Sequence, residues 1–194
     1  RVFPNFEQPD LKAVFNFRIT APKDWVVSSN GVLESQVVDP TDDSITKRVF
    51  SPTAKISTYI TAILAGEYFT ATTTYKPKSK VNSGDIPLVV YCRQSLKPHF
   101  DYEHIFMVTK NGLDFFQDLF DYPYPYPKYE QAFVPEYNIG AMENPGLVTF
   151  TEDYIFVSGA TEDDLEGRTN TICHEMAHMW FGDLVTMKWW DDLW

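Results

Sequence analysis

The chain has 194 residues, of which 44% are hydrophobic and 16% aromatic, a composition that can bury a sizeable core and excludes a wholly disordered protein. Its 27 acidic residues outnumber the 16 Lys and Arg residues and give a formal net charge of −11. This charge, with basic residues scattered along the chain, argues against binding to nucleic acid or anionic lipid. The acidity serves either ordinary solubility or the attraction of cationic ligands.

Cysteine count and hydropathy limit the class of protein further. Two cysteines, Cys92 and Cys173, are too few for a disulfide scaffold or a cysteine-based zinc site. No stretch approaches the ~18 consecutive apolar residues of a membrane span, and no Asn-x-Ser/Thr acceptor occurs. We therefore expect a cytoplasmic setting and no membrane contact by this segment. Because the chain starts at Arg1 and stops at Trp194, we also expect it to be an excerpt of a longer protein.

Alternation of apolar and polar residues predicts strands in the first half. Residues 15–19 show the period of a half-buried strand, and two apolar pairs flank Asn30-Gly31, a dipeptide that favours a tight hairpin turn. Residues 56–64 alternate again, and residues 88–91 form a further β-rich run. We therefore assign residues 1–93 to an all-β domain.

The period changes to that of a helix in the second half. Residues 101–120 carry a helical stripe, formed by Ile105, Val108, Gly112, Phe116 and Leu119. Residues 121–127 cannot continue that helix because of their prolines, and they form either a rigid buried connector or a partner-binding polyproline segment. We favour the connector, and we expect strands at 131–134 and 147–151.

A second helix has clearer boundaries. Thr161 is a candidate N-cap with Asp164 three residues later, and acidic residues crowd the first turn. Its apolar stripe consists of Ile172, Met176 and Trp180, and Gly182 is a candidate C-terminal stop. Residues 94–194 are therefore predicted to form an α+β unit.

This helix carries the motif His174-Glu175-Met176-Ala177-His178. Residues i and i+4 lie on one helix face, so both imidazoles can bind one metal ion. Glu175 stands beside them, where a carboxylate can take a proton from water activated by the metal. The alternative is a pair of ordinary histidines on a solvated helix beside a salt-bridging glutamate. The apolar flanking residues argue against that alternative, because burying these polar groups costs free energy unless they bind a partner such as a metal ion.

Two histidines are not a complete site, because catalytic zinc usually has three protein ligands. The other histidines, His99 and His104, lie near the start of the earlier helix. Either could be a third ligand, but we favour surface or capping roles for both. The third ligand is then expected beyond Trp194.

Two segments together resemble a known family. Gly140-Ala141-Met142-Glu143-Asn144, followed thirty residues later by residues 174–182, resembles the M1 aminopeptidases, gluzincins of the aminopeptidase N type. The resemblance covers nearly the whole chain and includes residues 1–9, 124–129, 134–138, 146–149 and 183–194. It implies part of an N-terminal β-saddle, followed by the start of a thermolysin-like α+β zinc metallopeptidase domain.

The resemblance also implies roles for individual residues. His174 and His178 would bind one Zn²⁺ per full-length chain, with Glu175 as general base. The family's third ligand, a Glu, and its oxyanion-stabilising Tyr would lie beyond Trp194. The excerpt alone is therefore expected to be inactive.

The other segment would bind the substrate, a peptide with a free N-terminal amine. Glu143 would hold that amine, which makes the enzyme an exopeptidase. Backbone groups of Gly140 and Ala141, with Met142 and Asn144 beside them, would contact the peptide. Without the resemblance, Glu143 reads as an acidic surface residue after a turn.

Two alternatives remain open. One is a catalytically silent relative that acts as a binding or scaffold module, which the intact His174-Glu175-x-x-His178 disfavours. The other is an epoxide hydrolase with side aminopeptidase activity. Relatives of that type carry Gly where this chain has Ala141, so the sequence resembles the broad-specificity aminopeptidase N branch more closely.

Overall fold

The computed structural model describes residues 2–81 and 83–193. Its elements in chain order are β1 (Arg18–Pro22), β2 (Val26–Ser29), β3 (Leu33–Asp39), β4 (Asp42–Phe50), β5 (Ile63–Gly66), β6 (Tyr68–Tyr75), β7 (Ile86–Arg93), α1 (Tyr102–Phe120), β8 (Tyr129–Val134), β9 (Ala141–Met142), β10 (Val148–Thr151) and α2 (Glu162–His178). This order confirms the predicted fold class, a β-rich N-terminal part followed by an α+β part.

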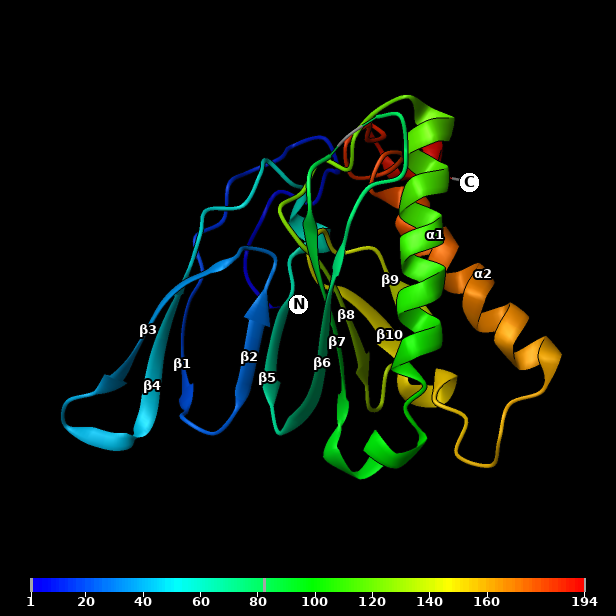
Figure 1. The fold of residues 1–194 in the computed structure, drawn as a ribbon. Coiled ribbons are helices and arrows are strands. Elements are labelled where there is room, and N and C mark those ends of the chain that lie inside the picture. Colours follow the sequence, from blue (N-terminus) through cyan, green and yellow to red (C-terminus); the bar gives the residue numbers. More distant parts are fainter. Residues whose placement is uncertain (1, 82, 194) are drawn as a thin grey trace.

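A five-stranded mixed sheet forms the centre of the α+β part, in the order β6-β7-β8-β10-β9. β7, β8 and β10 run parallel, whereas β6 and β9 pair antiparallel at the two edges. The helix α1 makes the crossover between the parallel strands β7 and β8, and it lies beside α2 at one side of the sheet (Figure 1). The sequence-predicted strands at 88–91, 131–134 and 147–151 are confirmed as β7, β8 and β10.

The sheet crosses the domain boundary predicted after residue 93. Hydrogen-bonded pairing joins β7, which precedes that boundary, to β8, which follows it. Strand β6 extends the same sheet, although it belongs to the sequence segment assigned to the all-β domain. A division between β5 and β6 would keep this sheet within one unit.

The N-terminal part contains a three-stranded antiparallel sheet, β1-β4-β3, and a two-stranded sheet, β2-β5. The predicted hairpin turn at Asn30-Gly31 is wrong, because β2 pairs with β5 while β3 pairs with β4. The segment instead forms the crossing between β2 and β3, where the chain passes from the two-stranded to the three-stranded sheet. Gly31 is needed there for close packing, since a Cβ atom would lie 2.3 Å from the carbonyl oxygen of Ser51.

Two other strand predictions differ from the structure. β1 begins at Arg18, so the predicted strand at 15–19 is displaced toward the C-terminus. Within 56–64 the chain forms a 3₁₀ turn at Thr58–Ile60 before β5 begins at Ile63. The hydroxyl of buried Ser57 donates to the carbonyl of Pro9, a contact between segments 48 positions apart that a continuous strand pattern does not predict.

Both predicted helices are confirmed. Asp101 caps α1, and Thr161 forms a reciprocal capping box with Asp164 at the start of α2. The two helices cross where Gly112 meets Met176, whose sulfur would lie 2.9 Å from a Cβ atom at position 112. Only the end of α2 differs from the prediction, because the helix ends at His178, before Gly182.

The segment 121–127 is the rigid connector that we favoured. Tyr124 and Tyr126 are buried, and the ring of Tyr124 packs edge-on against Trp180 at 6.0 Å between centroids. The hydroxyl of Tyr124 donates to the carbonyl of Lys128. These contacts attach the connector to the core beside the end of α2.

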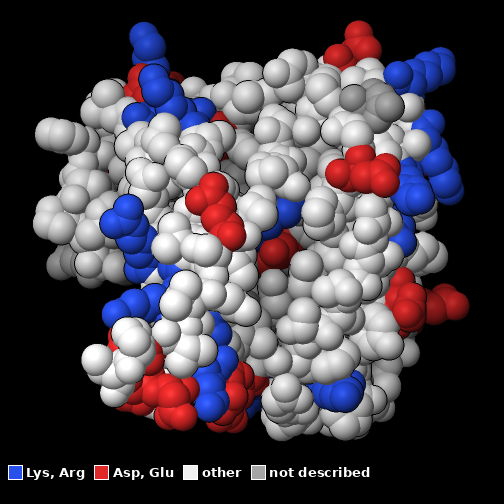
Figure 2. Space-filling view, turned by 60° about the vertical axis from the view of Figure 1, so that its left-hand side comes forward, with Lys and Arg blue, Asp and Glu red and all other residues white. Residues whose placement is uncertain are grey.

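Charged side chains of both signs are interspersed on the face seen in Figure 2, and the basic ones do not merge into one continuous surface. Among the described residues, neither helix combines the length and apolar character needed to cross a bilayer.

Candidate active site

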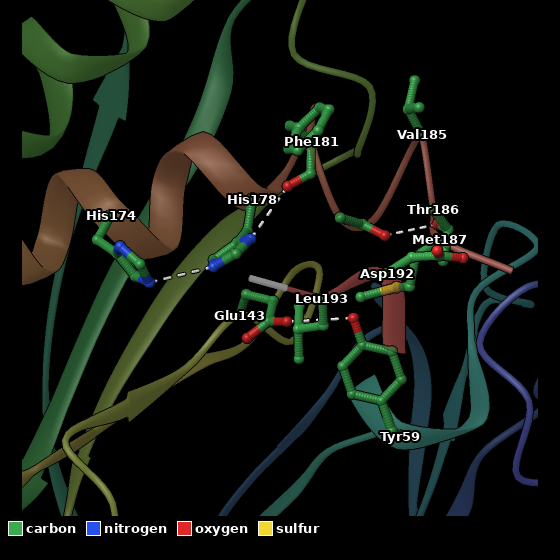
Figure 3. A pocket seen from close by; sticks show the side chains of 11 residues that line it. Tyr59, Glu143, His174, His178, Phe181, Val185, Thr186, Met187, Asp192 and Leu193 are labelled. Atoms are coloured by element: carbon green, nitrogen blue, oxygen red, sulfur yellow. Dashed lines mark hydrogen bonds between the residues drawn. The ribbon is translucent and has the colours of Figure 1, made fainter. Parts of the chain in front are cut away.

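The last two turns of α2 bring His174 and His178 together. Their Nε2 atoms lie 3.1 Å apart, and their rings stand nearly perpendicular with centroids separated by 4.7 Å. Figure 3 shows the two imidazoles pointing toward one another along the side of the helix. This is the arrangement that the i, i+4 spacing predicts.

The segment after the helix fixes the ring of His178. Its Nδ1 lies 3.0 Å from the carbonyl oxygen of Phe181, which can only accept, so Nδ1 carries the proton. The other ring nitrogen, Nε2, is the one that faces His174. Gly182 packs against this ring with φ at 135°, and a Cβ atom there would lie 2.9 Å from Nδ1. Gly182 thus makes room for the imidazole.

The imidazole pair fits a tetrahedral cation. Two nitrogens bound to one zinc at about 2.05 Å would lie about 3.3 Å apart, close to the observed 3.1 Å. Nitrogen lone pairs that face each other at this distance need a proton or a cation between them. A ring N–H donated to a backbone carbonyl, as in His178, is also the usual support of a metal-binding histidine.

Glu175 lies on the adjacent, buried side of α2. Only 5% of its surface is exposed, and its Oε2 atom has no hydrogen-bond partner among the described residues. Burial, with a smaller contribution from the charge of Glu143, raises the pKa of Glu175 to about 8.

Glu143 reaches the site from the opposite side, directly after the edge strand β9. Its Oε1 accepts a hydrogen bond of 3.2 Å from the hydroxyl of Tyr59 (Figure 3). Glu143 and the two histidines line one cavity of about 390 Å³. The remaining lining residues come from the 3₁₀ turn after Ser57 and from the segment after α2, and they are Tyr59, Phe181, Gly182, Val185, Thr186, Met187, Asp192 and Leu193.

The other residues of the predicted substrate-binding segment have different positions. Ala141 and Met142 are half-buried in β9 and pack against the core. Asn144 is buried, and its amide donates to the hydroxyl of Thr149 at 3.1 Å, so the side chain serves the loop itself. Gly140 is exposed, and a Cβ atom there would meet only the hydroxyl of Tyr154, at 3.6 Å. A close approach by substrate at Gly140 stays a prediction.

The remaining histidines lie outside this cavity. The backbone N–H of His104 donates to Asp101 in the cap of α1, and its ring contacts buried Arg168. Among residues 2–81 and 83–193, no cluster of three or more His, Cys, Asp or Glu side chains is arranged to hold a metal. The described residues thus bring together two imidazoles that could bind a metal.

The sequence analysis did not identify two residues near the site, Tyr59 and Asp183. Tyr59 was assigned to a strand, and only its contact with Glu143, 84 positions away, identifies it. Asp183 is 1% exposed, and neither of its carboxylate oxygens has a hydrogen-bond partner in the described part of the chain. Burial first, then the charge of Glu143, raises the pKa of Asp183 well above its usual range. An acidic residue next to a glycine gave no signal of such burial.

Sequence comparisons match the β-rich N-terminal part and the α+β part of the chain to two domains of one family. Residues 105–194 match the Peptidase family M1 domain, and residues 1–60 match the Peptidase M1 N-terminal domain. Aminopeptidase N of Streptomyces lividans is 50% identical over 194 residues, which are 100% of this chain and 21% of that protein. Aminopeptidase N of Mus musculus is 36% identical over 194 residues, covering 99% of this chain and 19% of the relative.

Endoplasmic reticulum aminopeptidase 1 of Homo sapiens is 34% identical over 195 residues, with 99% of this chain and 19% of the relative covered. The chain thus spans about a fifth of the length of these relatives. Because the two domain matches cover most of the chain and follow one another in the family's order, the chain belongs to peptidase family M1.

Proposed function

We propose that the complete protein is a zinc-dependent aminopeptidase that removes single residues from the free N-terminus of peptides. The observation that carries this proposal is the pair of Nε2 atoms of His174 and His178, 3.1 Å apart, in a cavity that Glu143 also lines. The names of the similar proteins, aminopeptidase N and endoplasmic reticulum aminopeptidase 1, support the same activity.

His174 and His178 would hold the zinc ion, with Phe181 and Gly182 fixing the orientation of His178. When bound, zinc supplies Lewis acidity, which lowers the pKa of water and polarises a carbonyl group. The isolated 194-residue chain is expected to bind zinc weakly and to be inactive, since its described residues bring only two ligands together.

Glu175 is the proposed general base. Its carboxylate takes a proton from the attacking water and delivers a proton to the leaving amine, so it ends the cycle in its starting state. Its position between the two histidines on α2, and an Oε2 atom with no hydrogen-bond partner among the described residues, support this role.

Glu143 is proposed to bind the α-ammonium group of the substrate. A half-buried carboxylate at the cavity wall attracts the positive charge of an ammonium group, and an acylated N-terminus has no such charge. This selection restricts cleavage to the first peptide bond, which distinguishes an aminopeptidase from an endopeptidase.

The test compares leucine p-nitroanilide with its N-acetyl derivative, using the complete protein. We expect turnover of the free amine only, loss of turnover after chelation, and recovery when zinc is restored. Glu143→Gln should lower kcat/KM for leucine p-nitroanilide by about 100-fold or more. The control Glu136→Gln changes an exposed glutamate of the preceding loop and should leave kcat/KM unchanged. Equal hydrolysis of both substrates would contradict the proposal, and stable binding of peptides without turnover would favour a silent binding module.

A further inference from the structure

A hydrogen bond links the proposed amine-binding residue to the N-terminal part of the chain. The hydroxyl of Tyr59 lies 3.2 Å from Oε1 of Glu143, and both side chains line the same cavity (Figure 3). This bond engages Oε1 only, and the carboxylate has a second oxygen with which to accept from a ligand. A glutamate side chain rotates about several bonds, so a fixed donor restricts where its charge lies.

Tyr59 is itself firmly held. It lies in a 3₁₀ turn between Ser57 and Ile60, both of which are fully buried, and its ring packs edge-on against Trp190 at 5.3 Å between centroids. Burial, followed by the negative charge of Glu143, raises the pKa of Tyr59 above its usual range. The hydroxyl therefore keeps its proton and acts as a donor toward Glu143.

Asn30 fixes the two segments that carry these side chains. Its amide nitrogen donates to the carbonyls of Ile60 and Pro145, each at 2.9 Å, and its amide oxygen accepts from the backbone N–H of Ala62. Asn30 is buried, so these bonds replace water that the groups would otherwise bind. One side chain thus joins the turn after Tyr59 to the loop after Glu143.

Gly146 permits this junction. Its φ is +76°, and a Cβ atom there would lie 2.4 Å from the backbone oxygen of Asn30. The loop that follows Glu143 therefore rests directly on the crossing between β2 and β3. The distance between the Tyr59 hydroxyl and the Glu143 carboxylate is set from both sides by backbone contacts.

We propose that Tyr59 is a positioning residue that holds the Glu143 carboxylate for the substrate's ammonium group, with Asn30 fixing the two backbone segments. Selection for a free N-terminus then depends on the N-terminal part of the chain as well as on the loop after β9 that carries Glu143. This inference rests on the proposed aminopeptidase function.

The experiment measures inhibition of the complete zinc-loaded enzyme by two hydroxamates. Leucine hydroxamate carries the amine, and 4-methylpentanohydroxamate lacks it, while both share the zinc-chelating group and the side chain. We expect the wild type to bind leucine hydroxamate more than tenfold more tightly. Tyr59→Phe should raise the inhibition constant of leucine hydroxamate by about tenfold, the effect expected from losing one hydrogen bond to a charged group. The inhibition constant of 4-methylpentanohydroxamate should change by less than about twofold.

The control is Tyr68→Phe, because Tyr68 is also half-buried but has Glu152 and Arg93 as its charged neighbours. Its two inhibition constants should match the wild type. In a second measurement, Tyr59→Phe is made in the Glu143→Gln background, where it should have no further effect on either inhibitor. An additional loss there would overturn the inference, because Tyr59 would then act independently of Glu143.

The remaining outcomes separate the inference from the function on which it rests. If the wild type discriminates but Tyr59→Phe keeps the same ratio, or weakens both inhibitors equally, the positioning role is wrong and the aminopeptidase proposal stands. If the wild type itself binds both hydroxamates equally, the proposed role of Glu143 fails and the inference fails with it.

Discussion

The carbonyl oxygen of Phe181 lies 3.0 Å from Nδ1 of His178, and Gly182 packs beneath the same ring. This contact sets the tautomer of His178 and turns its Nε2 toward His174. The residues that orient the ring of His178 therefore lie in the turn that follows α2.

Gly182→Ala should weaken zinc binding. The added Cβ atom would lie 2.9 Å from Nδ1 of His178, so the imidazole must move, and the loss of such support typically costs about 10–100-fold in metal affinity. The measurement is a zinc titration of the complete protein against a competing chelator.

The matched control is Gly159→Ala, since Gly159 also has positive φ, at 93°, but no atom lies within 4 Å of the added Cβ. Both variants introduce backbone strain, and only Gly182→Ala should alter zinc affinity. Equal losses in the two variants would show that strain, and not the histidine contact, is responsible.

The capping box of α2 should respond to acid. The carboxylate of Asp164 accepts hydrogen bonds from the backbone N–H and hydroxyl of Thr161, which lower the pKa of Asp164. A lowered folded-state pKa stabilises the folded helix end above the unfolded pKa of about 3.9, and this contribution is lost as pH falls through the folded-state value.

The measurement is amide exchange in the first turn of α2, corrected for the intrinsic pH dependence, between pH 6 and 3. Protection in the wild type should decrease toward the acidic end, whereas Asp164→Asn should show lower protection that is independent of pH. A wild-type profile that is equally flat would argue against the capping box as an acid-sensitive contact.

A buried charge network should stabilise the junction between the N-terminal strands and the central sheet. Lys128 donates to the carbonyl of Ser29 at 2.6 Å and lies 3.0 Å from Oε2 of Glu130, which also accepts from Tyr91. Burial lowers the pKa of Lys128, although Glu130 opposes that effect. Lys128→Met should reduce the free energy of unfolding by about 3–5 kcal/mol, because Glu130 would remain buried without its cation.

A double-mutant cycle tests this coupling. Lys128→Met combined with Glu130→Leu should cost clearly less than the sum of the single changes in chemical denaturation. The control is Lys47→Met, which removes the exposed cation of the ion pair with Asp39 and should change the denaturation midpoint little. Additive losses at Lys128 and Glu130 would mean that the two charges do not depend on each other.

Local signals in the sequence predicted the helix that carries the proposed zinc ligands. The capping residues and the i, i+4 stripe of α2 act within a few positions of one another, so they can be read without tertiary information. The face shared by His174 and His178 follows from the helix alone. The pairing of Glu143 with this helix depended instead on the resemblance to the M1 aminopeptidases.

Predictions failed where distant segments determine the conformation. Asn30-Gly31 has the composition of a hairpin turn, yet the amide of Asn30 binds backbone groups of Ile60, Ala62 and Pro145. The turn at Tyr59 likewise depends on a contact with Pro9 made by its neighbour Ser57. Such contacts leave no periodic trace in the sequence, so the link between Tyr59 and Glu143 could not be predicted.

The most direct test of the central claim is the activity and zinc content of Glu175→Gln in the complete protein. We predict one zinc per chain in both wild type and variant, with kcat/KM for leucine p-nitroanilide reduced by a factor of about 10²–10⁴ in the variant, because the amide cannot accept the proton. Undiminished turnover with zinc still bound would contradict the assignment of Glu175 as general base and, with it, the proposed mechanism.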